Sequence, residues 1–440
     1  MKKILQFFTS KIKYFILIYA SIQLLLILTS DIYYTSDASY YYNLAQQCID
    51  HNEYYPAKEH LYEDYIFAPL YINVTIIILK MSNSPLTISL FNLLIILVQI
   101  LILYKIALKI FSDKIASISV LLYIFYLNTL GLSILNYTEL FFVLLISLSI
   151  YLFLQSKNYS LVLSGIILGG AIAVRPTGWV LFIAFLALQL YVSYKNKKLS
   201  KSYFYLYGGI LIFILCFGRW TYSHFGKFEY SSTTGPVNLL IGANDDATGG
   251  FKATVFEKGK AGYIEHPETL TYIQKEDFYR GKAIIWIKEN SLKWISLAPL
   301  KLLHAFAWDD IAMSSLLGFQ EINFGRALKN LFAGNRTSNK LENESVLKYI
   351  FYFFILFLHH LYYYLLLGAI GFGLFHIIKN KLSNDGIKLI LFFSLISILL
   401  IMIVFGTPRF KYPIFILLLP FSAYYLNLKF VEGKQYLEKK

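Results

Sequence analysis

The segment LTISLFNLLIILVQILILYKIALKIF, residues 86–111, decides the fold class of this chain. About 20 apolar residues in a helix cross the hydrocarbon core of a bilayer, and this segment is longer than that. The whole 440-residue chain is 57% hydrophobic and only 15% charged, whereas soluble domains carry about 25% charged residues. We therefore expect an all-α polytopic membrane protein.

Similar apolar runs recur along the chain. Further spanning candidates cover residues 13–30, 115–134, 138–155, 160–174, 177–194, 203–221, 347–378, 389–405 and 412–428. Residues 67–80 are too short to span, so we expect a re-entrant or surface-lying helix there. The pattern predicts a bundle of roughly ten transmembrane helices. It shows no fixed-period repeat.

Lysines in the short connections predict the orientation of the helices. The run KNKKLSK at 195–201 is the strongest marker, because cytoplasmic loops carry an excess of Lys and Arg. The net charge of +14 is explained by such loops and does not require a nucleic-acid partner. Both termini are then inside, and we expect an integral, multi-pass protein of the cytoplasmic (inner) membrane.

The expected domain organisation is a single membrane domain over residues 1–440. Residues 31–66 form its first outer loop, 222–345 a large outer loop region, and 346–440 the C-terminal helices with a basic inside tail. Within the large loop, residues 276–308 alternate Trp, Lys and apolar residues, which is typical of a helix lying in the membrane interface. Cys48 and Cys216 are the only cysteines, and no His/Cys cluster indicates zinc.

Asp37 lies just past the first span, in TSDASYYYNLAQQ, residues 35–47. On a helix that starts here, Asp37, Tyr41 and Leu44 share one face, so the carboxylate would stand over an aromatic surface. Such a carboxylate can act as a general base towards a hydroxyl group. The alternative is that Asp37 is an ordinary acid of a first helical turn, favoured by the helix dipole.

Glu139 lies where an apolar span begins, in LNYTELFF. Acids near membrane depth are costly and are functional candidates. The alternative is again a helix N-terminal acid, with Thr138 as the capping residue.

Four basic residues lie at predicted outer helix ends, against the positive-inside tendency. They are Arg175, Arg219, Arg409 and Lys411. Each alone could extend to lipid headgroups, but together they indicate a phosphate site, since guanidinium binds phosphate in a bidentate manner. The glycine-rich stretch LIGANDDATGGF, with Asn244 and Asp245, is either a flexible turn or a binding loop.

These motifs, in this order, resemble the GT-C superfamily of polytopic glycosyltransferases. The likeness is to the bacterial branch related to the protein O-mannosyltransferases and the lipid A aminoarabinose transferase (similar to glycosyltransferase family 39). It is carried by SDASYYYNLAQQ, NYTELFFVLLISLSIYLF, RPTGWVLFIA, GRWTYSHFGKFEYSSTTGPVNLLIGANDDATGGF and GTPRFKYPIFILLLPFSAYY. The stretch APLYINVTIIILK lacks the paired prolines usual in the family. The first-loop motif SDASYYYNLAQQ has one acid, Asp37, where many relatives have an acidic pair.

The resemblance implies a GT-C-like bundle with extracytoplasmic juxtamembrane helices and an inverting transferase of the cell envelope. The donor would be a polyprenyl-phosphate sugar, and the acceptor a glycan, lipid or protein. Asp37 and Glu139 would be catalytic, Arg175, Arg219, Arg409 and Lys411 would bind the donor phosphate, and Tyr41, Asn238, Asn244 and Asp245 would form the substrate loop. No metal ligands are assigned, and a divalent cation as cofactor is left open.

Two other functions fit a polytopic chain. A transporter or flippase of a lipid-linked saccharide would have ionisable residues in mid-span and broken helices in paired halves. His359 and His360 are the main pair of that kind here, and the alternative, which we favour, is that they lie on an interfacial helix before a shorter span. A polysaccharide polymerase or ligase would depend on a large late outer loop.

Overall fold

The computed structural model describes residues 9–30, 36–309, 311–316 and 346–432, together with residues 7, 32 and 34. Within these ranges the chain is helical and forms no strand; its one β-type contact is an isolated bridge between Gly250 and Gly406. The predicted all-α polytopic membrane fold is confirmed. Residues 310, 317–345 and 433–440, which belong to the outer-loop and tail predictions, lie outside the described residues.

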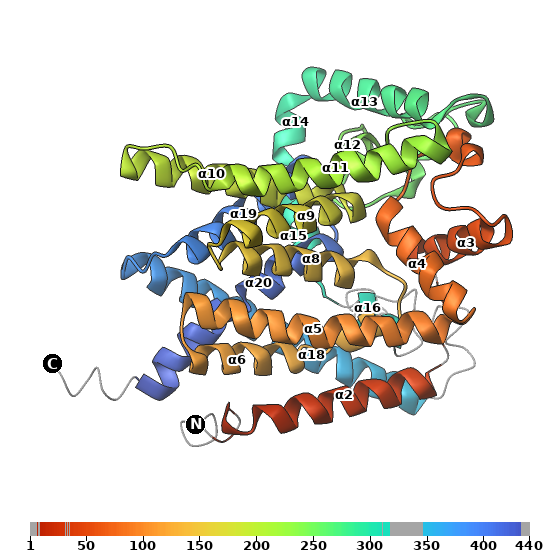
Figure 1. Ribbon diagram of the computed structural model, residues 1–440. Helices are drawn as coiled ribbons and strands as arrows, with labels where there is room; N and C mark the ends of the chain where they lie inside the picture. Colours follow the sequence, from red (N-terminus) through yellow and green to blue (C-terminus); the bar gives the residue numbers. More distant parts are fainter. Residues whose placement is uncertain are drawn as a thin grey trace.

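Long apolar helices form the body of the molecule, and most of them run roughly along one direction (Figure 1). In the described residues, seven helices are long and apolar enough to cross a membrane. They are α2 (Ile12–Thr29), α5 (Pro85–Ile110), α10 (Trp179–Asn196, extended by a 3₁₀ turn from Pro176), α11 (Tyr203–Phe225), α18 (Val346–Lys379, spanning from Ile350), α19 (Asp385–Ile403) and α20 (Pro408–Asn427, running on to Phe430).

Shorter helices complete the bundle. Three are apolar: α4 (Pro69–Met81), α8 (Thr138–Phe153) and α9 (Asn158–Val174). The predicted span at 115–134 is instead broken into α6 (Asp113–Ile124) and α7 (Asn128–Ser133). Between the two helices lies Tyr126, whose hydroxyl donates to Asp309, 2.5 Å away.

The connecting helices gather at one end of the bundle. Helix α3 (Ser36–Asp50) and α4 lie there, while the start of α2 and the end of α20 lie at the other (Figure 1). The lysine-bearing connections at 155–157, 197–202 and 380–384 also join helix ends remote from α3 (Figure 1).

The segment predicted as one interfacial helix forms three helices: α13 (Tyr272–Glu289), α14 (Ser291–Ser296) and α15 (Ala298–Phe306). Helix α13 packs on α12 (Gly235–Ile241) through a small core of its own, which includes Leu240, Tyr279 and Trp286. This core is separate from the main one between the long helices. The α12–α13 unit therefore covers the bundle as a distinct layer beside α11 (Figure 1).

Helices α9 and α11 pack very closely because Gly209 brings the backbones together. A Cβ atom at Gly209 would lie 2.1 Å from the carbonyl oxygen of Val162 on α9, a distance that no side chain can occupy. Small residues allow such close approach of membrane helices. The neighbouring Gly208 has open space at the same point.

We expect Gly209→Ala to lower the free energy of unfolding by about 2 kcal/mol, since one methyl group must force the two helices apart. Gly208→Ala is the matched control, one residue away on the same helix. It should be neutral or slightly stabilising, because Ala favours helix more than Gly does. The measurement is unfolding of the purified protein in mixed micelles, and equal stability of the two variants would contradict the close approach.

Candidate functional site: a charged cavity at the α3 end of the bundle

Four helix ends carry the charged residues of the site. Asp37 lies in the first turn of α3, Glu139 in the first turn of α8, and Arg409 directly after Pro408, the first residue of α20. Arg175 is the C-terminal cap of α9, with extended backbone, because the following Pro176 ends the helix. Segments 372 residues apart in sequence, at Asp37 and Arg409, thus meet at one point.

The four side chains form one ion-pair network. Arg409 Nε lies 2.5 Å from Glu139 Oε1 and Nη2 lies 3.2 Å from Oε2, so two nitrogens on one edge of the guanidinium hold this carboxylate. Arg409 Nη1 lies 2.5 Å from Asp37 Oδ2. Arg175 Nη1 lies 2.7 Å from Glu139 Oε1. Two carboxylates and two guanidinium groups therefore balance in charge.

Burial differs strongly across this network. The Glu139 side chain is 1% exposed, Arg175 and Arg409 are 15% and 18% exposed, and Asp37 is 39% exposed. Arg409 stacks over the Tyr137 ring at 4.2 Å, and Arg175 lies between the rings of Phe142 and Phe410. Glu139 is thus a buried anchor, whereas Asp37 is the carboxylate that a ligand can reach.

The turn before Arg409 is fixed by two other segments. Gly406 N–H donates to the Gly249 carbonyl at 2.8 Å, and Lys301 Nζ donates to the Ile403 carbonyl at 2.9 Å. A Cβ at Gly406 would lie 1.8 Å from the Lys301 carbonyl oxygen, so the close approach requires glycine. Burial lowers the pKa of Lys301 to about 8. The glycine-rich 242–250 loop therefore supports the start of α20.

A cavity of about 1000 Å³ opens beside the network. Asp37, Tyr41, Arg175 and Arg409 line its polar part. Helices α10 and α19 contribute part of its apolar wall, with Trp179, Val180, Ile183, Phe393, Leu400, Ile401 and, just after α19, Val404. The cavity can therefore hold a molecule that is charged at one end and apolar along its length.

The structure separates the predicted site residues into two groups. The cavity is lined by Asp37, Tyr41, Arg175, Asn238 and Arg409. Glu139 does not line it but forms ion pairs with Arg175 and Arg409.

The others lie elsewhere. Arg219 is exposed and stacks over Tyr222, and Lys411 is fully buried against Asp309 at 3.0 Å. The Asn244 amide caps the Leu240 and Ile241 carbonyls, and Asp245 accepts from Trp286.

Sequence reasoning missed Asp64 and Tyr65, which also line the cavity. They lie after α3, in LYEDYIFAP, where the only signal is an acidic and aromatic stretch in the loop that also holds Asp37. Buried Lys275 fixes Asp64 at 3.1 Å. Burial, with the Asp37 and Asp64 carboxylates, raises the pKa of Tyr65 well above its ordinary value, so its hydroxyl stays neutral and can donate.

Metal ligation is another role open to carboxylates such as these. Across the described part of the chain, no three His, Cys, Asp or Glu side chains gather as a metal-ligand set. Both Glu139 oxygens and one Asp37 oxygen contact guanidinium groups. These carboxylates therefore belong to an ion-pair network in this structure and not to a set of metal ligands.

The fold and site together define a polytopic all-α membrane protein with a charged cavity at one end of its bundle. Residues 68–222 match the family model described as dolichyl-phosphate-mannose-protein mannosyltransferase. No curated protein matches the chain.

Solved structures of the Archaeoglobus fulgidus oligosaccharyltransferase AglB share the fold. The form in complex with zinc and sulfate has a TM-score of 0.52 at 15% identity, covering 96% of this chain and 50% of that one. The complex with an inhibitory peptide and a dolichol-phosphate has a TM-score of 0.51 at 15% identity, covering 97% and 52%. This chain therefore spans about half the length of those proteins. The family match and the shared fold together confirm the predicted resemblance to the GT-C superfamily.

We expect Glu139→Gln to lower the free energy of unfolding by ~3 kcal/mol, because it leaves two largely buried guanidinium groups without their shared counter-ion. The control is Asp246→Asn, which removes a solvent-exposed ion pair with Lys260 and should leave stability unchanged. Unfolding of both variants in mixed micelles checks this, and a wild-type stability for Glu139→Gln would show that the network is not a structural anchor.

Proposed function

We propose that this protein is a glycosyltransferase that moves a sugar from a polyprenyl-phosphate-linked donor to an acceptor hydroxyl. One observation carries the proposal: Asp37, Arg175 and Arg409 line a single cavity that continues along an apolar wall. A lipid phosphate needs cations at its headgroup and apolar surface along its chain, and the cavity supplies both. The names of the matched family and of the AglB complex with a dolichol-phosphate support a donor of this class.

The reaction is an inverting displacement in one step. The acceptor oxygen forms a bond to the anomeric carbon as the bond from that carbon to the phosphate oxygen breaks. Asp37 takes the acceptor proton as general base. The lipid phosphate leaves as a monoester, and Arg175 and Arg409 stabilise its developing charge. No carboxylic acid is needed to protonate this leaving group, in contrast to the acid and base pair of glycosidases.

The geometry of Arg409 suggests how the donor activates the base. Glu139 engages Nε and Nη2 of Arg409, while Nη1 contacts the partly exposed Asp37. A donor phosphate that takes over Nη1 displaces Asp37 without disturbing the buried Glu139 contact. Asp37, no longer paired with a cation, is then a stronger base towards the acceptor. Donor binding would thus precede acceptor activation.

The site is proposed to face the extracytoplasmic side of the membrane. The lysine-bearing connections between α10 and α11 and between α18 and α19 join the opposite ends of the helices that meet at the cavity. Because lysine-rich connections stay in the cytoplasm, the cavity would lie outside. Tyr65, Asp64 and Asn238 would then line the acceptor side, where hydroxyl groups of a glycan, lipid or protein can hydrogen-bond.

We expect Asp37→Asn to reduce sugar transfer by about 10²–10⁴-fold, the usual contribution of a general base. Donor binding should be retained or tightened, because Arg409 loses a competing carboxylate. Asp50→Asn makes the same change at an exposed position of the same helix and should be active. The assay follows sugar release from purified polyprenyl-phosphate sugars, and near-normal transfer by Asp37→Asn would remove Asp37 as the base.

We expect Arg175→Met to weaken binding of polyprenyl phosphate about tenfold or more, as loss of a charge-assisted hydrogen bond does. Arg219→Met is the matched control, because Arg219 is exposed over Tyr222 and lies outside the cavity lining. Binding is measured by native mass spectrometry of the protein in lipid nanodiscs. Equal losses in the two variants would indicate general attraction to anionic lipid and not a phosphate site.

A further inference from the structure

A second buried polar cluster lies beside the network of Arg409, and the reaction proposed above does not use it. Its centre is the pair of Asp309, which follows α15, and Lys411 on α20; their side chains are 2% and 0% exposed. Lys411 Nζ lies 3.0 Å from Asp309 Oδ1 and also donates to the Trp308 carbonyl. Burying such a pair is costly unless further hydrogen bonds surround it.

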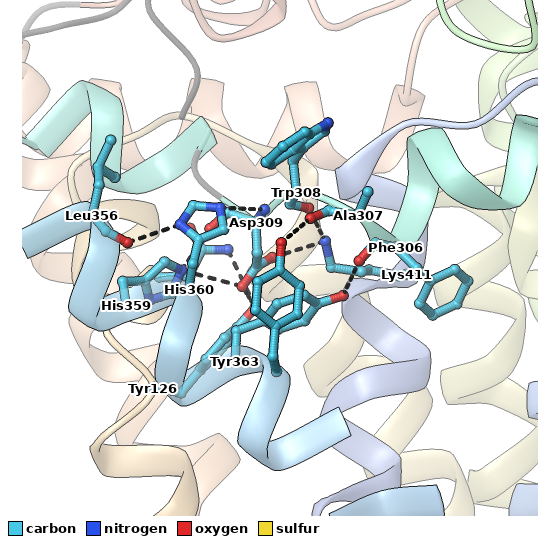
Figure 2. Close-up of polar contacts among 12 residues, drawn as sticks. Tyr126, Phe306, Ala307, Trp308, Asp309, Leu356, His359, His360, Tyr363 and Lys411 are labelled. Atoms are coloured by element: carbon cyan, nitrogen blue, oxygen red, sulfur yellow. Dashed lines mark hydrogen bonds and ion pairs between the residues drawn. The ribbon is translucent and has the colours of Figure 1, made fainter. Parts of the chain in front are cut away.

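Those further bonds come from α6–α7 and α18 (Figure 2). Tyr126 donates to Asp309 Oδ2, and His359 Nε2 lies 2.5 Å from the Asp309 carbonyl oxygen. His360 Nε2 accepts from the Asp309 N–H at 3.3 Å, so its Nδ1 carries the proton that is donated to the Leu356 carbonyl at 2.8 Å. Both histidines therefore bind Asp309, and their mid-span position is explained without an ion pathway.

The main chain before Asp309 is held in the same way. Tyr363 donates to the Phe306 carbonyl at 2.7 Å and Tyr364 to the Ala307 carbonyl at 2.6 Å. Lys411 donates to the Trp308 carbonyl, and His359 contacts the Asp309 carbonyl. The four consecutive carbonyl groups of residues 306–309 thus all contact side chains of α18 and α20 (Figure 2). The end of α15 is thus clamped to these two helices.

Lys411 and Arg409 lie on nearly opposite faces of α20, since two residues turn an α-helix by about 200°. One face of its first turn is held by Glu139 and Asp37, and the other by Asp309. The two clusters are also adjacent in space: a cavity of about 20 Å³ is lined by Glu139 and Arg409 from one and by Asp309 from the other. A rotation of α20 that breaks one set of contacts must therefore disturb the other.

We propose that Asp309 and Lys411 are positioning residues, which fix the rotation of α20 so that Arg409 presents its Nη1 edge to the cavity. This inference rests on the proposed function, which assigns Arg409 to the donor phosphate. It changes the role expected for Lys411: this residue binds no substrate and acts through Arg409.

The test uses the double variant Asp309→Asn/Lys411→Met, which removes both charges and so avoids leaving one buried charge unpaired. Gln99→Leu is the control for loss of a buried hydrogen bond, because Gln99 bonds Ser147 between α5 and α8 and lies outside both clusters. Arg409→Met is the reference for complete loss of the guanidinium. The full-length proteins are compared in nanodiscs.

Two measurements are made. Hydrogen–deuterium exchange follows the peptide covering residues 405–412, and native mass spectrometry measures the affinity for polyprenyl phosphate. In the double variant we expect faster exchange in this peptide and an affinity about tenfold weaker, because an aligned charged hydrogen bond is lost. Gln99→Leu should change neither, even where its unfolding temperature falls equally.

The outcomes separate this inference from the proposed function. The positioning role is overturned if the folded double variant shows wild-type exchange or wild-type affinity while Arg409→Met binds weakly. That result leaves the proposed function standing. If wild-type protein does not bind polyprenyl phosphate at all, the donor assignment fails, and the exchange measurement alone decides whether Asp309 and Lys411 hold α20.

Discussion

Burial of the Glu139 carboxylate is the constraint on which the site depends. A carboxylate that is 1% exposed in a helical membrane bundle must be paired, and here two guanidinium groups pair it. Those groups come from the end of α9 and the start of α20, so satisfying one acid fixes two helix ends. The partly exposed Asp37 then joins a network whose geometry is already set, and it can be exchanged for a ligand without loss of the anchor.

The same logic explains why the site lies where helices end. Ions at the ends of spans avoid the cost of crossing the hydrocarbon core, yet they can pair there with residues from distant segments. Pro176 and Pro408 make these ends abrupt, and the turn at 403–407 is fixed by the 242–250 loop and by Lys301. The loop thus acts on the site through backbone support of α20, whereas its own acid Asp245 is bound to Trp286.

The sequence predicts the fold well because hydropathy and lysine placement are properties of single segments. The expected span at 138–155 corresponds to α8 at Thr138–Phe153, and that at 203–221 to α11 at Tyr203–Phe225. The break between α6 and α7 escapes prediction, since the contact made there, between Tyr126 and Asp309, joins residues 183 apart. Asp64 is missed for a related reason: its place in the cavity depends on Lys275 of α13, and no local pattern marks that contact.

The contrast between Arg409 and Lys411 shows the limit of reasoning from composition. Both lie at the start of α20, two residues apart, and both are cations at a helix end that the sequence predicts to be outside, against the expected charge bias. Helical geometry gives them opposite faces and therefore opposite surroundings: a cavity for Arg409 and a buried aspartate for Lys411. A phosphate site inferred by counting basic residues would include both. Only the direction of each side chain separates a group that can meet a ligand from a group that holds the helix in place.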